Sequence, residues 1–212
     1  MSWNLICQEL LAFAFYFLYA SFFEWWFHKY LFHSPKLITR TFKAHQLVHH
    51  QRYKYPMQSY QAQEGQEKEH IAMDWFALPL FVGVHMPIFV LIQAVTGWQS
   101  MWGGIAAIMV YYCFYEYFHY CMHVPAGRLV EKTRLFSFIK EHHRLHHKYM
   151  QQNLNVFFPL ADLCLRTYRS KASVPQKATV AVPNAPGVPS GITPLAETAK
   201  QMRHKTATAG KK

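Results

Sequence analysis

Histidines are the residues of this chain whose type and spacing point most directly to chemistry. Ten of the 14 histidines fall into four short groups, HKYLFH, HQLVHH, HYCMH and HRLHH. The grouped residues are His28, His33, His45, His49, His50, His119, His123, His143, His146 and His147. Because imidazole nitrogens bind transition metals, these ten residues are candidate metal ligands.

The spacing within the groups predicts how the ligands would be shared. Residues four apart lie on one face of an α-helix, which predicts three converging pairs: His45 with His49, His119 with His123, and His143 with His147. Neighbouring residues diverge by about 100° around a helix, so His49 would serve one ion and His50 another. A zinc ion usually takes four ligands in total, and the ten imidazoles therefore predict two ions.

The identity of the metal follows from chemistry more than from affinity. An all-nitrogen set suits zinc, iron, copper or nickel. Two redox-active ions facing apolar helices suit the activation of O2 against an unreactive C–H bond, whereas zinc hydrolases keep an open water site with carboxylates nearby. We therefore predict two iron ions with O2 as co-substrate, although zinc could replace iron during purification because it binds such sites more tightly than Fe(II).

Some polar side chains close to the groups could orient the imidazoles by accepting their distal N–H. Glu24 precedes His28 by four residues, and Glu116 precedes His119 by three. The alternative interpretation of both glutamates is solvation of a helix end at a membrane boundary. Further candidates for an orienting role are Tyr120, His142 and Asn155. His142 could also compete with His143 as a ligand, because His142 lies four residues before His146.

Three apolar stretches could position these groups: 3–27, 75–95 and 101–115, the last continuing as helix to His123. About 20 helical residues cross a hydrocarbon core of ~30 Å. None of the 22 Lys and Arg residues lies before Lys29 or between Asp74 and Tyr115, which is the segregation expected of a membrane protein. We expect an all-α integral-membrane bundle of about three to four transmembrane helices with a cytosolic histidine-rich cap.

The positions of the basic residues also predict the orientation of the chain. By the positive-inside rule both polar regions are cytoplasmic, which brings the four histidine groups to one side of the membrane. That membrane would be the bacterial inner membrane or the endoplasmic reticulum. A signal peptide is the alternative for the first stretch, which lacks a positive n-region. Topology accounts for the net charge of +11, so no nucleic-acid partner is predicted.

Composition divides the chain into two parts. We expect a membrane oxygenase domain over residues 1–170 and a disordered tail, rich in Pro, Ala, Thr and Lys, over residues 171–212. Within the domain, residues 58–69 are expected to form an exposed loop, and the apolar strip 135–139 suits an interfacial or docking helix. The 4 cysteines show no CxxC pair, so neither a disulfide framework nor a cysteine zinc site is predicted.

Five segments taken together resemble the fatty acid hydroxylase superfamily, a membrane-bound group that includes fatty acid hydroxylases, sterol desaturases and carotenoid hydroxylases. They are EWWFHKYLFH (24–33), HQLVHH (45–50), EYFHYCMH (116–123), EHHRLHH (141–147) and NLNVFFPLADLCLRT (153–167). The resemblance implies a helical membrane fold with a cytosolic cap and a di-iron centre bound by the ten motif histidines. It also implies a lipid substrate in the bilayer, O2 as co-substrate and a separate electron donor of cytochrome b5 or ferredoxin type.

Two spacings depart from the common patterns of this superfamily. HQLVHH is HxxxHH where its hydroxylases commonly show HxxHH, and HYCMH is HxxxH where carotenoid hydroxylases have HxxxxH. The second departure favours the acyl or sterol branch. The predicted function is hydroxylation of a lipid C–H bond, fatty acyl or sterol-like, with desaturation or carotenoid hydroxylation as alternatives. Outside the enzymes, the alternative is a non-catalytic membrane metal-binding protein. A homodimer could complete the small bundle.

Overall fold

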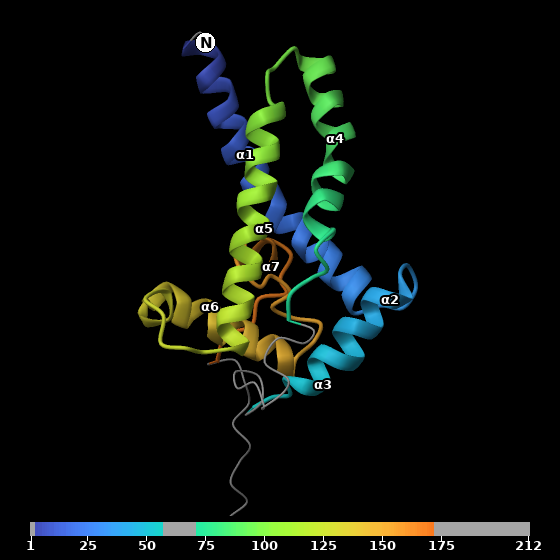
Figure 1. Cartoon of the computed structure of the whole chain (residues 1–212), viewed down its shortest axis with the longest axis vertical. Coiled ribbons are helices and arrows are strands. Elements are labelled where there is room, and N and C mark those ends of the chain that lie inside the picture. Colours follow the sequence, from blue (N-terminus) through green and yellow to red (C-terminus); the bar gives the residue numbers. More distant parts are fainter. Residues whose placement is uncertain (1–2, 57–70, 172–212) are drawn as a thin grey trace, which may run out of the picture. The chain divides into compact units, whose positions relative to one another are not determined.

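The computed structural model describes residues 3–56 and 71–171 of the chain. Within these ranges every regular element is a helix, which confirms the all-α prediction. Three long helices stand out in Figure 1: α1 (Trp3–Phe27), α4 (Ala77–Thr96) and α5 (Met101–His123), with α5 packed against the other two. The predicted loop at 58–69 and all but the first residue of the predicted tail lie outside the described residues.

The remaining helices are short and carry most of the histidine motifs. They are η1 (His28–Phe32), α2 (Thr39–Phe42), η2 (Lys43–His49), α3 (His50–Arg52), η3 (Val130–Lys132), α6 (Arg134–Lys148) and α7 (Leu160–Cys164). In Figure 1, α2, α3 and α6 lie at the end of the long helices that is away from the N-terminus. The motifs that are far apart in sequence can therefore meet at one end of the helical bundle.

Two segments are long and apolar enough to cross a membrane. They are Trp3–Phe32 and Ala77–Thr96, which correspond to the first two predicted crossings. Their apolar side chains largely point outward: Leu10 is 64% exposed, Leu91 62% and Val95 76%. A helix of a water-soluble protein would turn such side chains toward a core, whereas lipid accepts them on the outside. α5, the third predicted crossing, is 23 residues long but less apolar, since its second half carries the EYFHYCMH motif.

Glycines allow close contact among the three long helices. A Cβ atom added at Gly103 would lie 2.1 Å from the backbone oxygen of Glu9, so α5 approaches α1 at backbone distance there. A Cβ added at Gly104 would lie 2.8 Å from the ring of Phe89 and 3.0 Å from that of Tyr16. Small residues of this kind are what membrane helices use to pack tightly without a hydrophobic driving force.

A second hydrophobic core joins the C-terminal half of α5 to α6. Thr133 caps α6 by accepting a hydrogen bond from the backbone N–H of Phe136 at 3.1 Å. Phe136 and Ile139 are buried against Phe118 and Met122 of α5. The apolar strip predicted at 135–139 is therefore part of α6, with one side docked on α5 and the other side exposed.

Two of the short helices are π-helices, in which backbone bonds run from residue i to residue i+5. In η1, the N–H of His33 donates to the carbonyl of His28 at 3.1 Å. In η2, the N–H of His50 likewise donates to the carbonyl of His45. This wider turn places residues five apart, and not four apart, on one face, so both histidine pairs with five-residue spacing converge.

Candidate metal centre

Nine of the motif histidines gather into two groups, in each of which one ring nitrogen per residue lies within 4.8 Å of all the others. The first group is His28, His33, His45, His50 and His146, and the second group is His49, His123, His143 and His147. All nine are buried except His33, which is partly buried. The structure thus brings together residues from η1, η2, α3, α5 and α6, which span more than half of the chain.

Adjacent histidines serve different groups, as their divergence on a helix predicts. His50 and His146 belong to the first group, and their neighbours His49 and His147 belong to the second. The structure differs from the α-helical expectation for His45, which was paired with His49 on the basis of four-residue spacing. Because η2 is a π-helix, His45 converges with His50, and their Nε2 atoms lie 3.0 Å apart.

His119, the tenth motif histidine, borders the second group without belonging to it. Its ring lies 4.8 Å from that of His123 and 4.9 Å from that of His143, centroid to centroid. Its Nδ1 lies 3.1 Å from the carbonyl oxygen of Ile71, to which it donates. Its Nε2 is buried without a hydrogen-bond partner among the described residues, so this nitrogen remains available to an ion in the second group.

The hydrogen bonds of the first group show that its inward nitrogens are bare acceptors. The Nδ1–H groups of His33 and His146 donate outward, to the side-chain oxygen of Gln46 and to the carbonyl of Gln152. Their Nε2 atoms therefore both carry lone pairs, yet they lie 3.1 Å apart. Two lone pairs at this distance repel each other unless a cation lies between them. The donor set of the first group thus fits a bound metal ion.

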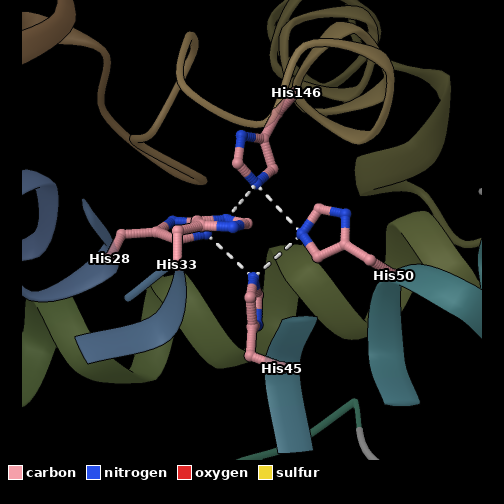
Figure 2. A group of neighbouring side chains, drawn as sticks. All are labelled: His28, His33, His45, His50 and His146. Carbon is pink, nitrogen blue, oxygen red and sulfur yellow. Dashed lines mark hydrogen bonds between the residues drawn. The ribbon is translucent and has the colours of Figure 1, made fainter. Parts of the chain in front are cut away.

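The distances between inward nitrogens bear on the number of ligands per ion. In the first group, successive Nε2 atoms are 2.9 Å (His28 to His45), 3.0 Å (His45 to His50) and 3.2 Å (His50 to His146) apart. Figure 2 shows the five rings turned toward one another. Ligands at about 2.1 Å from an ion lie about 3.0 Å apart at right angles and about 3.4 Å apart in a tetrahedron. The spacing therefore suits a site with more ligands than a tetrahedral zinc site.

The second group has the same spacing between nitrogens. The Nε2 of His143 lies 3.1 Å from that of His123 and 3.0 Å from that of His147. The Nδ1 atoms of His143 and His147 are buried and make no hydrogen bond with the described residues. Packing therefore orients His143 and His147, whereas oxygen acceptors orient His28, His33 and His146 of the first group.

Burial keeps these imidazoles neutral. It lowers the pKa of His33 to about 4. It also lowers the pKa of five further ligands well below the ordinary value, and the histidines around them add to this effect. These five are His45, His50, His143, His146 and His147. A neutral imidazole is the form that binds a metal ion. Both groups are therefore ready to bind metal at neutral pH.

These lowered pKa values predict that the metal-stripped protein loses stability in mild acid. Unfolded histidines take up protons below about pH 6.5, whereas folded His33 resists protonation until about pH 4 and the pKa values of the other five lie well below the ordinary value. The unfolded state then binds more protons, so the free energy of unfolding should fall steadily from pH 6.5 toward pH 4 and stay level above pH 7. Thermal unfolding of stripped protein across this range tests the prediction, and a flat profile would contradict it.

Among the described residues, no imidazole is hydrogen-bonded to Glu24 or Glu116, in contrast to the sequence-based expectation. Glu24 is buried and accepts from the backbone N–H of Val156 and from the side-chain amide of Asn155, at 2.5 and 3.0 Å. The Nδ1–H of His28 instead donates to the carbonyl of Leu154 at 2.5 Å. Glu24 and Asn155 thus act on His28 indirectly, by fixing the segment that supplies its acceptor.

The same arrangement recurs at Glu116. Its carboxylate accepts from the backbone N–H of Met73, two residues after Ile71, whose carbonyl binds His119. Each glutamate therefore holds a backbone segment whose carbonyl orients an imidazole. Sequence offers no signal for such carbonyl acceptors, because any residue type can supply one.

The other two predicted orienting residues also lie elsewhere. Tyr120 packs under the guanidinium of Arg128, 5.3 Å from its ring centroid. His142 belongs to neither group, and its Nε2 donates to the carboxylate of Asp162 at 3.0 Å. His142 therefore does not compete with His143 as a ligand.

Asp162 is the functional residue that sequence reasoning missed. It is fully buried and accepts from the backbone N–H groups of Leu154 and Asn155, at 2.9 and 2.8 Å, and from the hydroxyl of Thr167 at 2.6 Å. It thereby closes the loop that holds the Leu154 carbonyl against the first group. Its only signal in the sequence is its place in the NLNVFFPLADLCLRT segment.

The fold and the site define a helical protein with two membrane-length apolar helices and two buried histidine groups that could hold metal ions. The sequence model described as fatty acid hydroxylase matches residues 13–167, and the chain belongs to this family. This match confirms the resemblance that the histidine motifs indicate. No curated protein and no solved structure gave a significant match.

Proposed function

We propose that this chain is a membrane-bound oxygenase that binds two iron ions and hydroxylates a C–H bond of a lipid, using O2 and electrons from a separate donor protein. The observation that carries the proposal is the convergence of bare, buried imidazole nitrogens into two adjoining groups in a member of the fatty acid hydroxylase family. Desaturation of a lipid is the second candidate, because HxxxHH spacing also suits acyl desaturases and both reactions begin by removing one hydrogen atom from carbon.

The proposed topology has α1, α4 and α5 as three crossings with both histidine groups on the cytoplasmic side. The outward apolar faces of α1 and α4 support two of these crossings. The absence of Lys and Arg from α5 and the abundance of basic residues in the flanking polar regions support the third crossing and the sidedness. The membrane would be the bacterial inner membrane or the endoplasmic reticulum.

Bound iron would supply the redox chemistry with O2 that amino-acid side chains cannot perform. The protein's own contribution begins with the ligands: outward N–H bonds to backbone and amide oxygens fix His28, His33 and His146 with Nε2 facing inward. Burial of both groups excludes bulk water, which protects reactive species from side reactions. The apolar helices next to His28 would present the hydrocarbon part of a substrate.

The proposal is tested by measuring metal and lipids together. Wild-type protein and a variant with both His146→Ala and His147→Ala are expressed with added iron, and metal per purified chain is determined. We expect about two ions in the wild type, by the ligand count of each group, and a cellular lipid that is one oxygen atom heavier than its precursor. A lipid lighter by two hydrogen atoms would instead establish the desaturase. A folded, membrane-inserted wild type that holds no metal would refute both.

A further inference from the structure

An apolar cavity lies between α1, α4 and α5 and reaches His28 of the first group; with its open side included, the space is about 480 Å³. Among the described residues that line it, none is Lys or Arg. Its one carboxylate, Glu24, is already bound by Tyr111, Asn155 and Val156. The cavity therefore offers a ligand hydrocarbon contacts and no free charge.

The cavity runs lengthwise along the helices. On α1 its lining extends from Ala20 to His28, and on α5 from Ile108 to Tyr115. At a rise of 1.5 Å per residue, these spans correspond to roughly 12 Å and roughly 10 Å along the helix axes. One end of the cavity lies at the first histidine group, and the other lies deeper among the membrane-length helices, at Ala20 and Ile108.

The deeper end is closed by tight packing one helical turn further on. Tyr16 precedes Ala20 by four residues, Gly104 precedes Ile108 by four, and none of Tyr16, Gly104 and Phe89 lines the cavity. The rings of Tyr16 and Phe89 meet edge to face with centroids 4.7 Å apart. A Cβ at Gly104 would collide with both rings. A chain that runs along the helices into the cavity would therefore meet this packing just beyond Ala20 and Ile108.

The other end adjoins a second, more polar cavity, which measures about 630 Å³ with its open side included. The two cavities share Phe32, Met73 and Tyr115 as wall residues. The polar cavity is lined by His45 and His119, and further out by the exposed ion pair of Arg40 and Asp74, whose nitrogen and oxygen lie 3.0 Å apart. A ligand that spans both cavities would pass His28 and His45 of the first group and His119 beside the second, and would keep its polar part near Arg40.

We propose that the apolar cavity receives the end of a straight hydrocarbon chain, methyl group first, and that Ala20 and Ile108 set how far the chain enters. The inference rests on the proposed function. An extended chain of single bonds advances about 1.2 Å per bond. A chain that stops at Ala20 therefore has a carbon about ten bonds from its methyl end beside His28, roughly 12 Å away. The oxidised position would thus be counted from the methyl end and not from the head group.

The test changes the depth of the cavity at one residue. Ile108→Phe should shorten it and Ile108→Ala should lengthen it. The matched control is Met109→Phe, which adds a ring on the same helix one residue further on, where the side chain is 42% exposed on the outer surface. Metal-loaded proteins in lipid nanodiscs are titrated with straight-chain saturated fatty acids of increasing length, and binding is measured from the shift in Tm.

We expect the wild type and Met109→Phe to share one optimal chain length. The optimum should be shorter for Ile108→Phe and longer for Ile108→Ala, because each methylene that no longer fits lowers the affinity about fourfold. In cells, the oxidised carbon should move toward the methyl end in Ile108→Phe. An identical length preference in Ile108→Phe and Met109→Phe, or equal binding of all lengths by the wild type, would overturn the proposal.

The outcomes for the cavity and for the enzymatic function are separable. If the length preference shifts as expected but no lipid is oxidised, the proposed function fails and the cavity proposal holds. If a lipid is oxidised by the wild type and Ile108→Phe oxidises the same carbon of the same chain, the cavity proposal fails and the function holds.

Discussion

His146→Ala should remove the ion of the first group and His147→Ala the ion of the second, and either change should abolish lipid oxidation. The two residues are neighbours on α6 and are both buried. The Nε2 of His146 lies 3.1 Å from that of His33 and 3.2 Å from that of His50, whereas the Nε2 of His147 lies 3.0 Å from that of His143. Because the side chains diverge, each alanine opens one group and leaves the other complete.

The measurement is metal per chain together with product per cell. Loss of a residue that merely orients a ligand costs about 10–100-fold in metal affinity, so loss of the ligand itself should cost at least about a hundredfold. The matched control is Lys148→Ala, which changes the next, exposed residue of α6 and should retain both metal and product. If each single variant lost both ions together, the two groups would form one site and the division proposed here would be wrong.

Asp162→Asn should destabilise the loop behind the first group and with it the fold. The carboxylate is fully buried and accepts four hydrogen bonds, two from backbone N–H groups, one from Thr167 and one from His142. An asparagine would offer an N–H₂ group where an acceptor is required. We expect a loss of about 3 kcal/mol or more, because hydrogen bonds to a charged group contribute about 1.5–3 kcal/mol each and the abandoned donors stay buried.

Thermal unfolding of Asp162→Asn should show this loss, and metal content should fall as well because the Leu154 carbonyl would no longer be held toward His28. The comparison is Glu141→Gln, which removes a carboxylate from a partly exposed ion pair with Arg144 and should cost at most about 1 kcal/mol. Equal Tm values for the two variants would show that Asp162 is not the hub of this loop.

Features of the site that depend on local periodicity were predictable from the sequence. The apolar lengths of α1 and α4 predict their membrane character, and the four-residue spacing of His143 and His147 on α6 predicts their convergence. Likewise, the divergence of adjacent residues predicts that His49 and His50 separate into different groups. In each case the regular geometry of a helix determines the length of the segment or which side chains share a face, and the residue types alone indicate the helix.

Contacts between distant segments could not be predicted in this way. Glu24 was expected to contact His28, one helical turn away, but its partners are Asn155 and Val156, more than 130 residues further along the chain. The four-residue spacing of Glu24 and His28 does not favour a contact with His28 over a contact with Asn155 and Val156, because either contact satisfies a buried carboxylate. The choice depends on how α7, which carries Asp162, and the loop before it dock on α1, and no periodic pattern encodes that docking.

The π-helix at Lys43–His49 explains how the HQLVHH motif tolerates a spacing that differs from the HxxHH of related hydroxylases. In HxxHH on an α-helix, the outer histidines are four residues apart and share a face; in HQLVHH on a π-helix, His45 and His50 are five apart and share a face as well. The wider turn holds one more residue between the outer histidines and still leaves them on one face. Searches for relatives that fix the number of residues between histidines would therefore overlook chains with an intact site.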